Sequence, residues 1–140
     1  MNTKIKKYLT FFLFFSFLLI LLGYTFLHSY QFGVCASYLS ICAFRFELIG
    51  EPMFYGGIAL SIVFFVLLFT HEYAFSAWKK FAIWYVPIAA LIMISFSKLS
   101  EGSFFPEPDP STISYYLSVV YVVVSVLIIA VQFFRRGRGS

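Results

Sequence analysis

The chain has little charge and almost no cysteine. Only 11% of its 140 residues are Asp, Glu, Lys or Arg, whereas soluble domains have ~25%. Two cysteines are too few for the disulfide framework of a small secreted protein. The 20 phenylalanines and ten tyrosines exclude a disordered tail, and one water-soluble core of this size cannot hide them all. A soluble enzyme is therefore excluded as well.

Apolar residues make up 61% of the chain. They form four charge-free runs of 17 to 22 residues, and a helix needs ~20 to cross the ~30 Å hydrocarbon core of a bilayer. The runs are residues 8–27, 53–70, 81–97 and 113–134. They do not alternate in polarity as barrel strands do, and backbone groups in lipid must be paired within the protein. We therefore expect an all-α polytopic membrane protein, a single domain over residues 1–140 with four transmembrane helices in an up-down bundle.

Lysine and arginine are distributed unevenly between the two sides of this bundle. Arg45 and Lys98 lie in the expected outer loops, residues 28–52 and 98–112, together with five of the six acids. The other eight basic residues flank the opposite ends of the runs: Lys4, Lys6, Lys7, Lys79, Lys80, Arg135, Arg136 and Arg138. Because basic flanks remain in the cytoplasm, we expect both termini there and the chain in the plasma membrane. The alternative for the first run is a cleaved signal peptide, but such apolar stretches are usually ~7–15 residues long.

The loops and the prolines give further expectations. Apolar residues recur at helical spacing between Val34 and Leu48, which fits either an interfacial helix or a compact loop. Pro87 removes the hydrogen bond to the carbonyl of Ile83 and predicts a kink in the third run. In the second outer loop, the alternating prolines at 106, 108 and 110 predict an extended polyproline II linker.

Small and polar residues mark two faces within the runs. Gly56, Gly57 and Ser61 lie on the second run, with Gly57 and Ser61 four residues apart. A longer polar stripe follows a helical rhythm along the fourth run: Ser114, Ser118, Tyr121, Ser125, Ile128 and Gln132. Small residues let helix backbones approach closely, so we expect helix packing at these faces. The alternative is that the stripe lines a small cavity.

The runs contain no ionisable side chain other than tyrosine. Ion and proton transporters keep such groups on their pathways, so transport of this kind by the chain alone is not expected. His28 and His71 lie at opposite ends of two runs and cannot share a metal. The sequence predicts no metal and no resident cofactor. The net charge of +4 is spread over helix ends, which indicates contact with lipid headgroups and not with nucleic acid.

Cys35 and Cys42 both lie in the first outer loop. In one straight helix their Cα atoms would be ~10.5 Å apart, too far for a disulfide. Either the loop bends and the pair is bonded, or the loop is helical and both thiols are free.

This layout, with Cys35, Cys42, Arg45 and the stretch 50–52 before the second run, resembles quinone-linked disulfide-forming proteins and the vitamin K epoxide reductase family. The resemblance implies thiol–disulfide exchange with a quinone. Those families carry a second cysteine pair, usually including a C-x-x-C, which this sequence lacks. One pair cannot pass electrons to another within the chain, so a structural disulfide or unreactive thiols are the favoured interpretation.

The expected function follows from these features. With no reactive group in the runs, we expect a small multi-pass protein without catalysis, which packs in the bilayer against another membrane protein or against itself. One alternative is a membrane thiol–disulfide oxidoreductase that uses Cys35 and Cys42. The second is a carrier or channel for a neutral or lipid-like solute along the face from Ser114 to Gln132.

Overall fold

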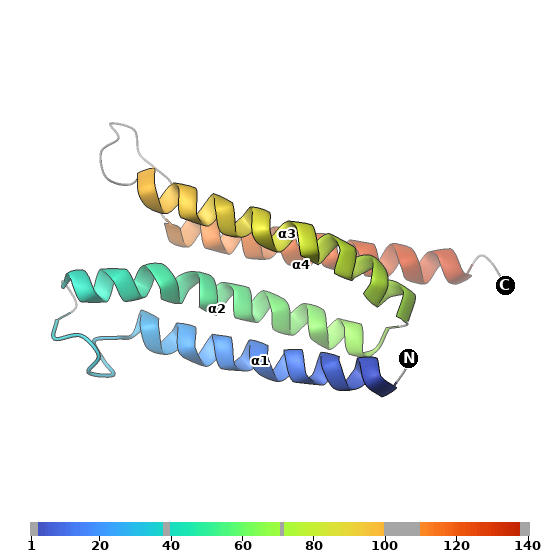
Figure 1. Cartoon of the computed structure of the whole chain (residues 1–140), viewed down its shortest axis with the longest axis horizontal. Coiled ribbons are helices and arrows are strands. Elements are labelled where there is room, and N and C mark those ends of the chain that lie inside the picture. The colour runs from blue at the N-terminus through green and yellow to red at the C-terminus, as the bar shows by residue number, and fades with distance from the viewer. Residues whose placement is uncertain (1–2, 38–39, 71, 100–109, 138–140) are drawn as a thin grey trace.

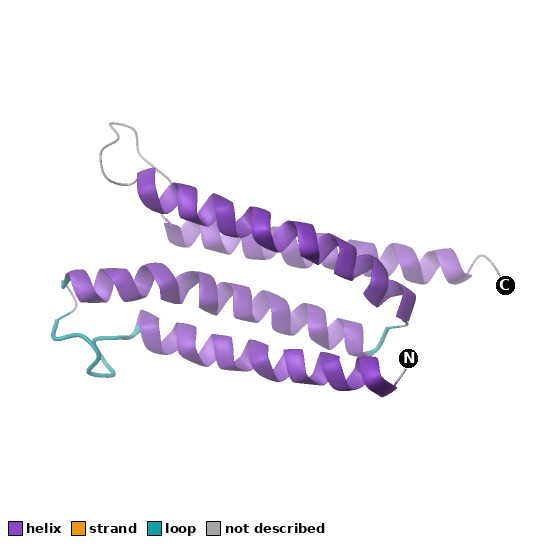
Figure 2. Ribbon diagram, viewed as in Figure 1, coloured by secondary structure: helices purple, strands orange, loops and turns teal. Residues whose placement is uncertain are grey.

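The computed structural model describes residues 3–37, 40–70, 72–99 and 110–137. Every regular element in these segments is an α-helix (Figures 1 and 2). The helices are α1 (Thr3–Leu27), α2 (Ile41–Leu68), α3 (Glu72–Leu99) and α4 (Pro110–Gly137). They run alternately up and down, and the described ends of α1 and α4 lie at the same end of the molecule (Figure 1). The expected all-α architecture is confirmed.

The helices have 25 or 28 residues, so each is ~38–42 Å long and exceeds the ~30 Å hydrocarbon core. Three of them are long and apolar enough to cross a membrane: α1, α2 and the segment Ser111–Arg135 of α4. The first part of α3 is more polar because it carries Glu72, Lys79 and Lys80. The long apolar part of α3 therefore begins only at Phe81.

The structure makes the first outer loop shorter than the expected 28–52, because residues 41–52 form the first turns of α2. Ser40 starts this helix as its N-cap, and its hydroxyl accepts a hydrogen bond from the Ala43 amide at 3.2 Å. Pro52 lies inside the helix, where its ring removes one backbone hydrogen bond. The cap and the helical apolar spacing outweigh this single loss. The periodicity between Val34 and Leu48 thus belongs in part to α2 and not to a separate surface helix.

The tightest helix contact joins α1 to α2 along their length. A Cβ atom placed on Gly23 would lie 2.5 Å from the backbone nitrogen of Phe54. One placed on Gly57 would lie 2.8 Å from Cγ1 of Ile20. Ser16 of α1 is completely buried in this contact region. Glycine is needed at these positions because the two backbones leave no room for a side chain.

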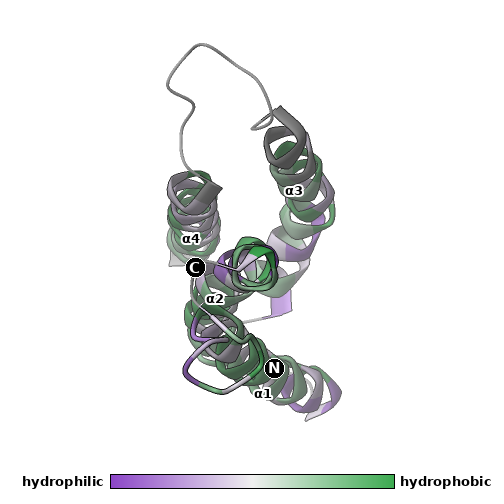
Figure 3. Cartoon of the chain, turned by 90° about the vertical axis from the view of Figure 1, so that its left-hand side faces the viewer, coloured by the Kyte–Doolittle hydropathy of each residue, from purple (hydrophilic) through white to green (hydrophobic). Residues whose placement is uncertain are grey.

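The remaining helices pack in series rather than evenly around one axis. α2 packs on α4, and α4 packs on α3, whereas α2 and α3 make few contacts with each other. Viewed end-on, α2 lies between α1 and the α3–α4 pair (Figure 3). The prominent buried cluster is at the end that holds the termini, where the ring of Trp78 meets Phe64 edge-on with centroids 5.5 Å apart. α3 is therefore anchored at that end and separated from α2 at the other.

Candidate functional site

A cavity of about 240 Å³ opens between α2, α3 and α4 in the half of the molecule away from the termini. We call it the three-helix groove. All three helices contribute small residues to its wall: Gly56, Ala59, Ala89, Ala90, Ser114 and Ser118. Tyr85 and Tyr121 lie at the level where the groove ends. The groove exists because α3 separates from α2 here, and small side chains do not fill the gap.

The polar groups along the groove are largely engaged within the chain. The Tyr85 hydroxyl donates to the Leu117 carbonyl at 2.7 Å, and the Ser114 hydroxyl donates weakly to the Met93 sulfur at 3.7 Å. The Tyr121 ring packs against the rings of Phe81 and Tyr85, with centroids 6.0 and 5.4 Å away. With these hydroxyls engaged, the wall offers mainly apolar surface to a ligand.

Two buried hydroxyls remain without a hydrogen-bond partner in the described part of the chain. They belong to Tyr121, which also lines the groove, and to Ser61 of α2. Tyr121 is 5% exposed. Both side chains therefore act chiefly as packing groups within the helices.

Gly56 and Gly57 are neighbours in sequence but face different surroundings. Gly57 contacts Ile20 of α1, as described above. A Cβ atom placed on Gly56 would find no atom within 4 Å, and Gly56 lines the three-helix groove. No packing contact of the described chain therefore explains why residue 56 is a glycine.

The polar stripe of α4 divides into two parts. Ser114, Ser118 and Tyr121 line the groove. One turn further on, Ser125 is completely buried and accepts a hydrogen bond from Nε1 of Trp78 at 3.2 Å. Gln132, near the end of the stripe, is half-buried. The cavity and the packing interpretations thus each apply to one half of the same stripe.

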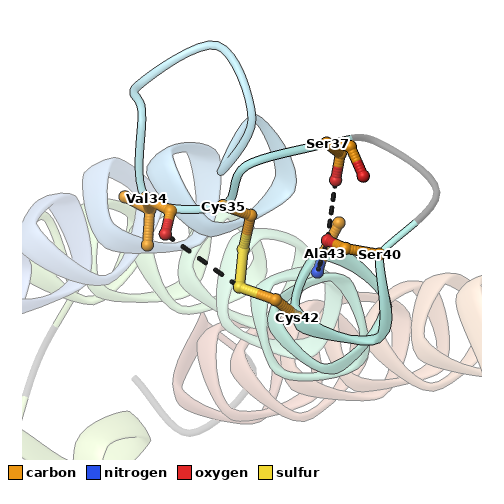
Figure 4. The surroundings of a disulfide bond; sticks show 6 residues. All are labelled: Val34, Cys35, Ser37, Ser40, Cys42 and Ala43. Atoms are coloured by element: carbon orange, nitrogen blue, oxygen red, sulfur yellow. Dashed lines mark hydrogen bonds between the residues drawn. A yellow bond between two sulfur atoms is a disulfide. The ribbon is translucent and has the colours of Figure 1, made fainter.

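The two cysteines form a disulfide with an S–S distance of 2.06 Å. Their Cα atoms are 5.9 Å apart, so the bent-loop alternative is the one that the structure adopts. The bond ties the loop after α1 to the first turn of α2 (Figure 4). Gly33, the one described glycine with a positive φ (71°), lies in the same loop. Cys35 is 4% exposed, so its sulfur is shielded from solvent.

A second cavity, of about 360 Å³, lies between this loop and the start of α2. His28, Gln31 and Glu47 contribute its polar side chains. The Nδ1 atom of His28 is 3.1 Å from the Tyr24 carbonyl. The described residues contain no group of three His, Cys, Asp or Glu side chains that could hold a metal ion.

Some residues singled out from the sequence lie elsewhere. Pro87 lies inside α3, and the kink expected there stays a prediction. His71 and the prolines at 106 and 108 are outside the described residues, while Pro110 is the first residue of α4.

The sequence analysis did not identify Gly23 and Gly50, which form the close contact of α1 with α2. A signal was present, since Leu9, Ser16 and Gly23 recur every seven residues and Gly50 and Gly57 share that spacing. A repeat of seven places residues on one helix face. It also missed Trp78, whose partner Ser125 is 47 positions away.

The fold and the groove define a small all-α protein with three helices suited to a membrane and an apolar cavity at one end. No protein-family model matches the chain, and no curated protein and no solved structure matches it either. The function must therefore be argued from the groove and its surroundings.

Proposed function

We propose that the chain crosses the plasma membrane four times, with both termini in the cytoplasm. The shared position of the two ends supports this (Figure 1), because the basic residues flank that end and basic flanks remain inside. Large apolar side chains cover the outside of the helices, which suits lipid and not water. Among the most exposed are Phe11, Phe14, Phe65, Trp84, Val123 and Phe134. Protease-accessible tags on the first and last residues would test the proposal, and cleavage of one tag from each face of the membrane would contradict it.

We propose further that the protein has no catalysis of its own and acts by binding another component of the membrane through the three-helix groove. The carrying observation is Gly56, which faces the groove and has no neighbour within 4 Å of a Cβ position. Glycine inside a helix is unfavourable relative to alanine by about 1 kcal/mol. A contact from outside the chain gives this glycine the role that α1 gives to Gly57.

The alternative of thiol–disulfide exchange receives less support from the geometry. Cys35 and Cys42 are the two cysteines of the sequence, and they are bonded to each other in a position that fixes the loop onto α2. Cys35 is shielded, whereas reactive cysteines are accessible and activated by their surroundings. This pair therefore favours a structural role.

Native mass spectrometry of the full chain, released gently from its own membranes, would test the binding proposal. We expect a membrane component to remain bound to the wild-type chain and to be lost from Gly56→Leu, whose side chain occupies the groove. The control is Val120→Phe, which enlarges an exposed side chain of α4 that does not line the groove. Equal retention by both variants, or no component on the wild-type chain, would overturn the proposal.

A further inference from the structure

The dimensions of the three-helix groove restrict what it can hold. Its lining residues on α4 run from Ser114 to Tyr121, and those on α2 run from Pro52 to Leu60. At 1.5 Å per residue, both stretches give a length of ~11 Å. The volume of about 240 Å³ then corresponds to a mean cross-section of ~20 Å².

This cross-section distinguishes between a helix and a hydrocarbon chain. A helix with its side chains is ~10–12 Å wide, which gives a section of ~80–110 Å². The groove is therefore several times too narrow for a transmembrane helix of a partner or of a second copy. Its section matches that of one extended hydrocarbon chain.

The position of the groove also fits a lipid chain. If the chain spans the bilayer as proposed, the groove lies in the leaflet opposite the termini and runs parallel to the helices. Its length of ~11 Å is most of the ~15 Å depth of one leaflet. Tyr85 and Tyr121 mark its deep end, and Pro52, Met93 and Ser114 lie at its shallow end.

We propose that the three-helix groove binds one acyl chain of a phospholipid from the leaflet opposite the termini. This inference rests on the proposed function and names the component that is bound. The apolar wall supplies contact along the chain, and Gly56, Ala89 and Ala90 leave the space that it occupies. The headgroup stays at the membrane surface, beyond Pro52 and Ser114.

Photocrosslinking in vesicles would test the proposal. The full chain is reconstituted with phosphatidylethanolamine and phosphatidylglycerol, together with a phosphatidylglycerol that carries a diazirine within one acyl chain. We expect the adducts to map to groove-lining residues of α3 and α4, such as Ala89 and Ser118. Gly56→Leu should lower these adducts by roughly tenfold, the scale of one modest loss in binding energy, whereas Val120→Phe should leave them unchanged.

A second variant, Ala90→Leu, fills the groove from the α3 side and should have the same effect as Gly56→Leu. This keeps the test informative if one of the two proteins fails to fold. Adducts spread evenly around α4, including Val120, or unaffected by both fillings, would overturn the acyl-chain proposal. Retention of a protein in the native mass spectrum, lost on filling the groove, would overturn it too while leaving the proposed function intact.

Discussion

The two sides of α2 are built in opposite ways. On the α1 side, Gly23 and Gly57 allow backbone contact so close that a methyl group at either position would clash. On the α3 side, Gly56 faces a cavity, and α2 and α3 make few contacts. The same residue type therefore closes one helix pair within the chain and leaves room for an external molecule beside another.

This difference shows what a glycine in a membrane helix can indicate. Helix association in lipid depends on close packing, because lipid tails are as apolar as leucine side chains. A glycine that the chain itself covers contributes to that packing. A glycine that the chain leaves uncovered indicates where something else packs, and the predictions below separate the two cases.

The largest effect is expected for Gly23→Leu. The Cβ atom alone would lie 2.5 Å from the Phe54 backbone nitrogen and 2.8 Å from its Cα, so α1 and α2 must move apart. We expect the free energy of unfolding to fall by about 3 kcal/mol, as in other overpacked sites. Unfolding in mixed micelles titrated with dodecyl sulfate measures this, and a wild-type midpoint would show that the close contact does not exist.

A somewhat smaller effect is expected when Cys35 and Cys42 are both replaced by serine. The disulfide spans seven positions and closes the loop on the α1–α2 side. In the chain-entropy model, a ring of this size contributes about 2.5 kcal/mol. The double variant should unfold earlier by this amount in the same titration, and wild-type protein treated with a reductant should match it. Unequal results for the two would contradict the assignment of the loss to the bond.

Trp78→Phe should cost about 1 kcal/mol, a typical value for a hydrogen bond between membrane helices. The change removes the donor to Ser125, whose side chain is completely buried. A double-mutant cycle with Ser125→Ala isolates the pair. A coupling energy near zero would mean that the hydrogen bond does not hold α3 to α4.

The smallest change in stability is expected for Gly56→Leu. A Cβ atom at this position meets nothing within 4 Å, and leucine is the better helix former by up to about 1 kcal/mol. The variant should therefore unfold within about 1 kcal/mol of the wild type in detergent that contains no lipid. A larger loss would show that the groove is closed by the chain itself.

Much of the fold could be predicted from the sequence. The four apolar runs all lie inside observed helices, because a run of apolar residues reports helix position directly. The start of α2 was predicted less well. Ser40 is a helix cap, but Pro52 and the charged residues Arg45, Glu47 and Glu51 resemble a loop when each is considered alone. Helix limits depend on local capping, which hydropathy does not reveal.

The site could be predicted only in part. The polar stripe containing Ser114, Ser118 and Tyr121 was identified from its spacing, because residues three and four apart share a helix face. Its division into a cavity half and a packed half depends on how far α3 lies from α2. The opposite surroundings of Gly56 and Gly57 likewise depend on which helices pack on α2, and sequence spacing alone carries no such information.

The most direct test compares Gly56→Leu with Gly57→Leu in one unfolding experiment. The two positions are adjacent on α2, so helix propensity and depth in the membrane are closely matched. We predict that Gly57→Leu loses about 3 kcal/mol through its clash with Ile20, whereas Gly56→Leu stays within about 1 kcal/mol of the wild type. Equal losses for the two variants would contradict the claim that one glycine packs against the chain and the other faces an open groove.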